Sequence, residues 1–201
     1  VTVSVLYWRL LLQPVLSMAS RAPVSLCIGS SSPHRRAVIE AEFGATLRLS
    51  QCSPDIDEKA IRDPDPAALT MAIARAKMAA VVAKLATSGE PMPDFVVTSD
   101  QVATHGGVIR EKPESEEENR AFLRSYRHGS VVTIASFVVR NTATGADVEG
   151  THECETFFGE VTDAMIERIV ARGVTMWCAG GFAIEDEDLN SVLVRVRNGT
   201  V

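Results

Sequence analysis

Short apolar runs and longer amphipathic segments alternate along the chain, and they predict strands and helices in turn. Strands are expected over six short runs: 24–29, 46–49, 95–99, 131–140, 152–159 and 191–196. Helices are expected over four longer segments: 34–43, 65–86, 115–126 and 162–172. Alternation of this kind indicates an α/β domain with a mixed sheet and flanking helices.

Capping residues mark the starts of the predicted helices. Ser32 followed by Pro33 suits an N-cap and a first helical position. Ser115 and Glu118 have the spacing of a capping box. These signals indicate where two of the helices begin.

The longest predicted helix opens at Asp65 and repeats its apolar residues every three or four positions. Leu69, Ile73, Ala76 and Ala80 form the stripe that we expect to be buried. The stripe indicates that one side of this helix packs against the sheet.

Composition is that of an ordinary globular protein. The 201 residues suit one domain with two lobes, since a domain takes about 150 residues. Hydrophobic residues make up 46% and charged residues 23%, which excludes a disordered chain. With 26 acidic and 20 basic residues the formal charge is −6, so we expect neither nucleic acid nor a membrane as a partner. A small anionic ligand stays open if basic residues converge locally.

The four cysteines, at 27, 52, 154 and 178, lack the spacing of a zinc site or a disulfide framework. We interpret them as reduced thiols of an intracellular protein, and we expect a cytoplasmic location.

The N-terminal run 1–17 is apolar, but Arg9 and Pro14 interrupt it and it is too short to span a membrane. We therefore treat 1–23 as an N-terminal extension, either a leader or a start placed upstream of Met18, and 24–201 as the domain.

The segment 30–36 (SSSPHRR) offers a phosphate site. It places hydroxyl groups and two guanidinium groups, those of Arg35 and Arg36, at the N-terminus of a predicted helix. Helix N-termini attract anions through their unpaired N–H groups, and the arginine fork matches phosphate oxygens. The alternative is a capped helix with solvated arginines.

Two further places offer carboxylates. The loop 55–58 (DIDE) can bind Mg²⁺ or Mn²⁺, or it is a solvated acidic loop. Asp100 is expected where the strand 95–99 ends, at the sheet edge that binds ligands in α/β proteins. There it can bind a metal, accept a proton from water or cap a turn, and Lys112 supplies a cation nearby.

The segment 179–185 (AGGFAIE) combines two glycines, an aromatic ring and an acid. This combination suits the border of a base-binding pocket, or simply a tight turn.

Taken in order, these segments resemble the Maf (septum-formation protein) family of nucleoside triphosphate pyrophosphatases. The resemblance covers nearly all of the chain from Val24 onwards. It is carried by SSSPHRR at 30–36, DIDE at 55–58, ARAK at 74–77, TSDQV at 98–102, EKP at 111–113, GSVVT at 129–133 and CAGGFAIE at 178–185.

The resemblance implies a two-lobed α/β fold, similar to the inosine triphosphatases, with an active-site cleft between the lobes. It also implies a homodimer and a divalent metal ion, Mg²⁺, Mn²⁺ or Co²⁺. The implied reaction is hydrolysis of a nucleoside triphosphate between its α- and β-phosphates, which gives a nucleoside monophosphate and pyrophosphate.

The family's residue roles can be placed on this chain. Asp100 is the implied proton acceptor that activates water, and Glu58 and Asp100 are the implied metal ligands. The implied phosphate ligands are Ser30, Ser32, Arg35, Arg36, Lys77 and Lys112.

Three positions, His34, Gln101 and Glu185, are implied to separate substrate groups. The pyrimidine-directed branch tends to carry arginine, threonine and glutamine there, whereas Gln101 and Glu185 are similar to the branch that acts on 7-methyl-GTP. We therefore expect 7-methyl-GTP or a related modified nucleotide as the substrate. The alternatives are a pyrimidine nucleoside triphosphate pyrophosphatase and a non-catalytic nucleotide-binding regulator of cell division.

The chain departs from the family at Glu111, which replaces a usual glycine, and after its last predicted strand, where the family's usual tail does not follow. We expect the family's C-terminal helix to be missing from these 201 residues.

Overall fold

Strand pairing organises the part of the chain that the structure describes. The computed structural model describes residues 24–198, without the side chains of His34 and His128. Within this range seven strands form one mixed sheet in the order β2–β1–β3–β5–β6–β7, and β4 pairs with β3. The strands are β1 (Val24–Gly29), β2 (Leu47–Gln51), β3 (Phe95–His105), β4 (Val108–Arg110), β5 (Ser130–Asn141), β6 (Asp147–Phe158) and β7 (Leu193–Arg197).

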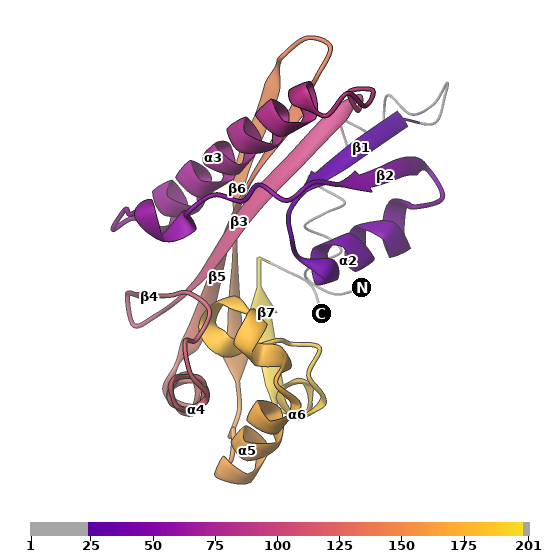
Figure 1. The fold of residues 1–201 in the computed structure, drawn as a ribbon. Coiled ribbons are helices and arrows are strands. Elements are labelled where there is room, and N and C mark those ends of the chain that lie inside the picture. Colours follow the sequence, from indigo (N-terminus) through magenta and orange to yellow (C-terminus); the bar gives the residue numbers. More distant parts are fainter. Residues whose placement is uncertain (1–23, 199–201) are drawn as a thin grey trace. The chain divides into compact units, whose positions relative to one another are not determined.

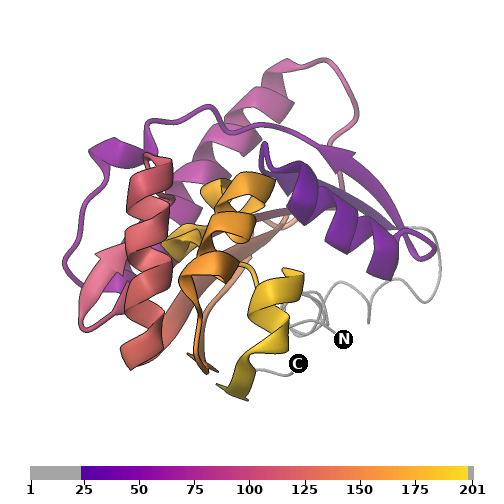
Figure 2. The same ribbon diagram turned by 90° about the horizontal axis from the view of Figure 1, so that it is seen from below.

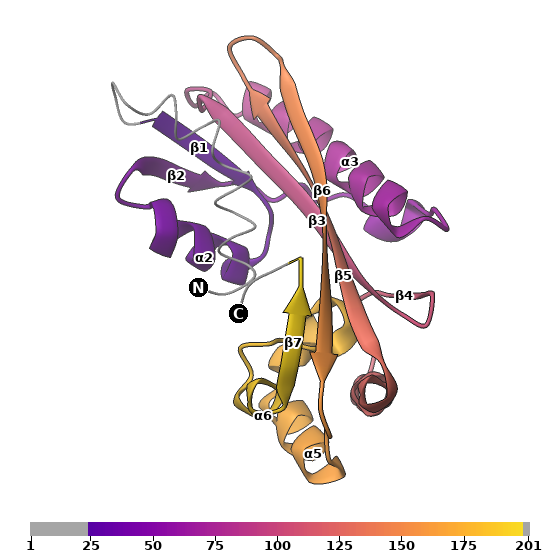
Figure 3. The same cartoon turned by 180° about the vertical axis from the view of Figure 1, so that it is seen from behind.

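Both parallel and antiparallel pairs occur in this sheet. β1 lies parallel to β2 and β3, whereas β3–β4 and β6–β7 are antiparallel pairs. Figure 3 shows β7 beside β6. The expected α/β class with a mixed sheet is confirmed.

Helices flank these strands, as predicted. The α-helices are α2 (Pro33–Phe43), α3 (Pro66–Thr87), α4 (Glu116–Ser125), α5 (Asp163–Arg172) and α6 (Glu187–Ser191). Short 3₁₀-helices are η1 (Glu58–Ala60), η2 (Tyr126–His128), η3 (Val174–Trp177) and η4 (Ala179–Gly181). The caps expected at Ser32 and Ser115 are confirmed, since their side chains accept hydrogen bonds from the amides of Arg35 and Glu118.

The described chain divides into two compact units. The first comprises 24–100 and 135–152, and the second comprises 101–134 and 153–198. Each has an apolar core of its own.

In the first unit, α2 and α3 cover opposite faces of the strands. Leu26 and Ile28 of β1 pack in one cluster with Ile39 of α2. Cys27, which lies between them, packs in another cluster with Met78 of α3. Successive side chains of a strand point to opposite faces, so each helix occupies its own side. Figure 1 shows α3 alongside the part of β3 that belongs to this unit.

In the second unit, α4, α5 and the segment after α5 build the core. Leu123 of α4, Ile166 and Ile169 of α5, and Leu189 of α6 are fully buried in one cluster. Figure 2 shows α4 and α5 side by side, and an ion pair between Arg120 and Glu167 joins them.

The buried stripe of α3 differs from the prediction. Leu69 and Ile73 are buried as expected, but Ala76 and Ala80 are only half-buried, and the buried face runs through Lys77 instead. Ala74 and Met78 also lie on this buried face, beside Lys77, which turns inwards to two carboxylates described below. Among the described helices, only α3 is long and apolar enough to cross a membrane by length and composition, and one side of it is buried in the core of the first unit.

The strand expected to end at Asp100 continues to His105, so that prediction is wrong. Val102 and Ala103 are buried in the second unit, and Ala103 pairs with Arg110 of β4. Asp100 therefore lies within a strand and not at its end.

The last strand also begins later than predicted, because 187–191 is helical. Asp186 caps this short helix by accepting hydrogen bonds from the amides of Asp188 at 3.0 Å and Leu189 at 3.3 Å.

Two arginines of α5 bind the acidic segment at the start of α6. Arg168 Nε donates to Asp188 Oδ2 at 3.2 Å, and Arg172 Nη2 donates to the same oxygen at 2.7 Å. Arg172 Nε also donates to Asp186 Oδ2 at 2.9 Å. The hydrogen bond from Arg168, followed by that from Arg172, holds the pKa of Asp188 below its ordinary value. This carboxylate therefore stabilises the fold in its ionised form.

We expect Asp188→Asn to lower the melting temperature at pH 7. The folded-state pKa of Asp188 is depressed, so its contribution is present above the unfolded-state pKa of about 3.9 and is lost as the pH falls below it. Thermal melts between neutral and strongly acid pH would show wild type and variant converging at the acid end. Glu153→Gln is the control, since Glu153 is an exposed carboxylate of the same unit. Curves that stay equally far apart at every pH would contradict this assignment.

Candidate active site

The turn from β1 into α2 forms the predicted phosphate loop. Ser30 is buried, and its Oγ accepts hydrogen bonds from the Ser32 amide at 3.2 Å and from the Arg35 guanidinium at 3.4 Å. The same guanidinium donates to the Ser99 carbonyl oxygen at 3.1 Å. Arg35 thus ties this loop to β3 one residue before Asp100.

Gly29 lets β1 approach β3 closely just before the loop. A Cβ at this position would lie 2.5 Å from Thr98 Cγ2 and 3.1 Å from the Val97 carbonyl oxygen. No side chain fits there unless the strands move, so glycine sets the point at which the loop begins.

Gln51 is a positioning residue that sequence reasoning missed. From the end of β2 its Nε2 donates to the Ser30 carbonyl oxygen at 2.6 Å. The parallel register pairs Gln51 with Ile28, which brings the end of β2 beside the loop that follows β1. Only knowledge of that register would have revealed the contact.

A buried lysine lies between two of the predicted carboxylates. Lys77 Nζ is 2.8 Å from Asp100 Oδ1 and 3.0 Å from Glu58 Oε1. The side chains of Lys77 and Asp100 are only 5% and 9% exposed, whereas that of Glu58 is 49% exposed. Three of the predicted site residues, Lys77, Asp100 and Glu58, therefore lie together, with the Lys77 ammonium group between the two carboxylates.

Burial dominates the electrostatics of Asp100. Loss of solvation raises the pKa of this carboxyl above its ordinary value, and Lys77 and then Arg35 oppose the shift. The nearby Glu58 carboxylate raises the pKa further. A carboxylate with a raised pKa is a stronger base than one in water.

The three carboxylates of the acidic loop 55–58 have three different partners. Asp55 forms an ion pair with Lys84 of α3, and its backbone has a φ of 48°. Asp57 caps η1 by accepting a hydrogen bond from the Lys59 amide at 3.1 Å. Only Glu58 of these carboxylates reaches Lys77, so the loop as a whole is not a carboxylate cage.

Arg36 stands apart from this group. Its Nε lies 3.4 Å from Glu40 Oε2, an i,i+4 pair along α2 in which both side chains are partly exposed. Exposed pairs of this kind contribute only about 0.2–1 kcal/mol. The structure does not join Arg36 to Ser30 and Arg35, and its role in phosphate binding stays a prediction.

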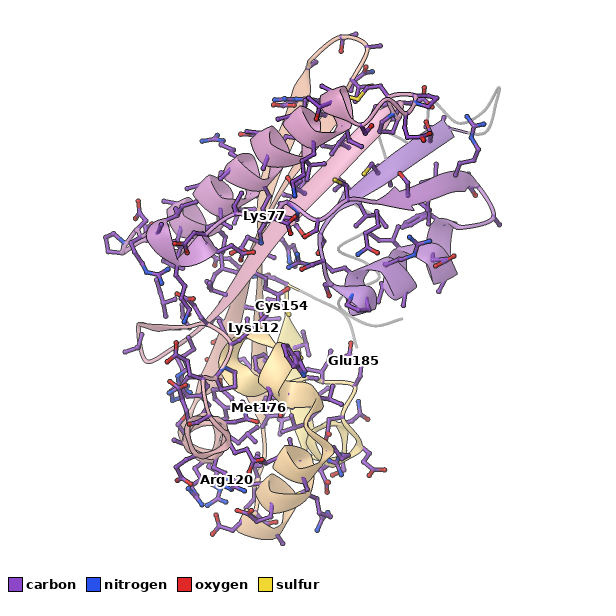
Figure 4. All side chains as sticks on the ribbon, viewed as in Figure 1. Lys77, Lys112, Arg120, Cys154, Met176 and Glu185 are labelled. Carbon is purple, nitrogen blue, oxygen red and sulfur yellow. The ribbon has the colours of Figure 1, made fainter. Side chains whose placement is uncertain are left out.

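The other predicted site residues belong to the second unit. Gln101, Lys112 and Glu185 are all exposed. Burial raises the pKa of the Cys178 thiol, the Glu185 carboxylate raises it further, and the Lys112 ammonium opposes both. Lys112 and Glu185 therefore lie near the same thiol, and Figure 4 labels both in this unit. The side chain of His34 lies outside the described part of the chain.

Hydrogen bonds hold the glycine turn η4 in place. Asn119 Nδ2 donates to the Gly181 carbonyl oxygen at 2.7 Å, and the Tyr126 hydroxyl donates to that of Gly180. The Gly180 amide donates to the Glu111 carbonyl oxygen at 2.9 Å. These bonds tie the segment that contains Lys112 to the segment that leads to Glu185.

The donor set is compatible with a metal ion held by two carboxylates. Within 24–198 no three histidine, cysteine, aspartate or glutamate side chains gather as a metal cage. Glu58 and Asp100 supply two carboxylates that meet at Lys77. Mg²⁺ is often bound by one or two carboxylates with substrate phosphates completing its shell, and these residues fit that arrangement.

Fold and cluster together define a class: an α/β protein with a strand–loop–helix turn, rich in hydroxyl and guanidinium donors, beside a buried lysine–carboxylate pair. Residues 25–200 match the family described as Maf-like protein, and the chain belongs to this family.

Relatives with known names cover most of the chain. A 7-methyl-GTP pyrophosphatase of Dictyostelium discoideum is 43% identical over 162 residues, which are 80% of this chain and 81% of that protein. A 7-methyl-GTP pyrophosphatase of Alcanivorax borkumensis is 31% identical over a match that covers 90% of this chain and 86% of that protein. A dTTP/UTP pyrophosphatase of Chromobacterium violaceum is 32% identical over a match that covers 79% of this chain and 77% of that protein. These matches confirm the expected family and its class, a nucleotide pyrophosphatase and hence a hydrolase.

We expect Lys77→Met to lower the free energy of unfolding by about 3–5 kcal/mol, because it leaves the buried Asp100 carboxylate without its partner. Lys84→Met, two turns along the same helix, removes a solvent-exposed pair with Asp55 and should cost far less. Urea unfolding of both variants measures the difference. Equal losses would show that the Lys77–Asp100 pair is as well solvated as a surface pair.

Proposed function

We propose that this protein hydrolyses 7-methyl-GTP between its α- and β-phosphates, giving 7-methyl-GMP and pyrophosphate. One structural observation carries the proposal: the buried Asp100 carboxylate lies against Lys77, next to the loop that Arg35 ties to Ser99. The similarity to 7-methyl-GTP pyrophosphatases supports the choice of substrate.

Residues of the first unit supply most of the phosphate ligands in this proposal. Ser30, Ser32 and Arg35 present hydroxyl and guanidinium donors at the start of α2, and Lys77 adds an ammonium group. The N-terminus of α2 supplies backbone N–H groups and its dipole to the same ligand. Arg36 and Lys112 complete the expected set of phosphate ligands.

Asp100 is the general base that takes a proton from the attacking water. Its raised pKa makes it more basic, and Lys77 and Arg35 keep the ionised form accessible in a buried place. The water then attacks phosphorus and displaces the pyrophosphate group or the nucleoside monophosphate. Lys77 and Arg35 are also placed to offset the negative charge that gathers on the phosphoryl oxygens.

Glu58 and Asp100 would hold the metal ion, Mg²⁺, Mn²⁺ or Co²⁺. When bound, it polarises the phosphoryl group and neutralises part of the triphosphate charge.

In this proposal Glu185 of the second unit binds the base. A guanine ring presents an N1–H and an exocyclic amine, two donors that the Glu185 carboxylate can accept. Methylation at N7 adds positive charge, which a carboxylate favours over a neutral pyrimidine. His34 and Gln101 are the other two positions expected to set specificity.

A pyrimidine nucleoside triphosphate is the second candidate substrate. The 32% identity to the dTTP/UTP pyrophosphatase of Chromobacterium violaceum favours it, because that identity is as high as the identity to several 7-methyl-GTP enzymes. Glu185 is the residue that decides between the two, since a carboxylate has no donor for a pyrimidine carbonyl oxygen.

The setting of the reaction is also part of the proposal. The four cysteines are free in the described structure, which is consistent with a reducing cytoplasm. A homodimer and a cleft between two lobes are expected from the family resemblance, and sedimentation of the full chain tests the dimer.

We expect Asp100→Asn to lower kcat for pyrophosphate release by about 10²–10⁴-fold, because an amide cannot accept the proton from water. Pyrophosphate release is measured with 7-methyl-GTP and each of Mg²⁺, Mn²⁺ and Co²⁺. Asp63→Asn is the matched control: Asp63 accepts a hydrogen bond from the Asp65 amide, and asparagine can keep it. Full activity in Asp100→Asn would remove the mechanism.

We expect Glu185→Gln to lower kcat/KM for 7-methyl-GTP by about tenfold or more, because one of two charge-assisted hydrogen bonds is lost. The value for dTTP should stay the same or rise. Glu187→Gln removes an equal charge from the same segment and should change neither value, since Glu187 is paired with Arg172. If wild type prefers dTTP or UTP, and Glu185→Gln does not alter that preference, the assignment of 7-methyl-GTP is wrong.

A further inference from the structure

Trp177 is the most exposed large apolar side chain of the described residues. Its relative exposure is 78%, and that of Val174, one 3₁₀ turn earlier in η3, is 57%. Side chains three apart in a 3₁₀-helix lie above one another, so the two form a single small apolar patch. A large indole in water is unfavourable, and such patches commonly mark contact sites.

Trp177 is carried by a well-anchored turn and not by a loose loop. Thr175, two residues before Trp177, is fully buried, and its Oγ1 donates to Asn119 Oδ1 at 2.7 Å. Asn119 in turn donates to the Gly181 carbonyl oxygen at 2.7 Å. The Cys178 amide donates to the Thr175 carbonyl oxygen at 3.1 Å. The backbone on both sides of Trp177 is therefore fixed, and the indole is presented to solvent at a defined place.

The surroundings of this turn carry the two charges expected of a nucleotide site. The carbonyl oxygen of Cys178, the neighbour of Trp177 along the chain, accepts a hydrogen bond from the Gly181 amide at 2.9 Å, in the turn that leads to Glu185. The Gly180 amide donates to the carbonyl oxygen of Glu111 at 2.9 Å, and Glu111 is the residue before Lys112. An exposed aromatic ring, a carboxylate and an ammonium group thus occur in one part of the second unit.

We propose that the Trp177 indole is a stacking surface for the methylated purine base, acting together with Glu185. This rests on the proposed function and adds a specificity-determining residue to it. A 7-methylated guanine is flat and carries delocalised positive charge, and tryptophan is the best aromatic partner for a cation. Glu185 would bind the edge of the ring while Trp177 covers its face.

The size of the patch favours a base over a protein partner. A tryptophan side chain buries about 150–250 Å². A stable protein interface needs about 800 Å² from each partner. Trp177 and Val174 alone supply an area that suits one planar ring, so a second copy of the chain is the less fitting occupant.

The chain contains two tryptophans, Trp8 and Trp177, which makes a direct test practical. In a Trp8→Phe background, Trp177 is the only indole and its fluorescence reports on its surface. We expect 7-methylguanosine, which has no phosphate, to quench this fluorescence at lower concentration than guanosine or uridine, at slightly acid pH. Absence of quenching by 7-methylguanosine would overturn the inference.

Kinetics of the full chain provide the second readout. Trp177→Ala should raise KM for 7-methyl-GTP about 3- to 30-fold, with a smaller effect on dTTP, and Trp177→Phe should restore part of the loss. Val108→Ala, which shortens another exposed apolar side chain of the same unit, is the control and should change neither KM.

The outcomes separate this inference from the proposed function. If wild type hydrolyses 7-methyl-GTP with preference and Trp177→Ala leaves its KM unchanged, the stacking role is wrong and the proposed function stands. If wild type prefers a pyrimidine nucleotide, the proposed function fails first. If Trp177→Ala instead converts a sedimenting dimer to a monomer with unchanged KM, the patch is a subunit interface and the inference is overturned.

Discussion

The ion pair between Lys77 and Asp100 is the interaction on which the first unit depends. A buried ammonium group is tolerated only when carboxylates compensate it, and Lys77 meets two, at 2.8 and 3.0 Å. This requirement keeps Lys77 on the buried face of α3, which it shares with apolar residues such as Ala74 and Met78. It also draws Glu58 towards the sheet, because Glu58 is the second carboxylate. Arg35, bonded to the Ser99 carbonyl oxygen, adds a second cation beside Asp100.

The elements could be predicted from the sequence far better than their contacts. Caps and apolar spacing indicated α2, α3, α4 and α5 correctly, since these signals are local. The predicted stripe through Ala76 and Ala80 was wrong, because a pattern of apolar residues favours burial of alanine over burial of lysine. In the fold Lys77 is buried in an ion pair with Asp100. The predicted end of β3 was wrong, because an aspartate after an apolar run was taken as the end of the strand. In the structure the strand continues past Asp100 into the core of the second unit.

The candidate site shows the same limit. Asp100, Lys77 and Glu58 were expected from motifs, and their meeting at one ammonium group follows from the pairing of β3 with β1 and from the position of α3. Gln51 was missed, since its contact with Ser30 depends on the register of β2 against β1. Asp55 could not be told from Glu58 by sequence, because only the fold shows that Lys84 binds it.

One of the boundaries between the units falls between Asp100 and Gln101, and this has a consequence for specificity. Asp100 belongs to the first unit and is buried, whereas Gln101 belongs to the second and is exposed. Alternate residues of a strand point to opposite faces, so the two neighbours need not share surroundings. In the proposed function, the general base and most phosphate ligands belong to the first unit, and most residues that distinguish bases belong to the second. Lys112 of the second unit and His34 of the first are the exceptions. Substitutions at Gln101, Trp177 or Glu185 can then alter the preferred base without disturbing the Lys77–Asp100 pair. Such a separation would explain why relatives with similar identity to this chain are named for different nucleotides.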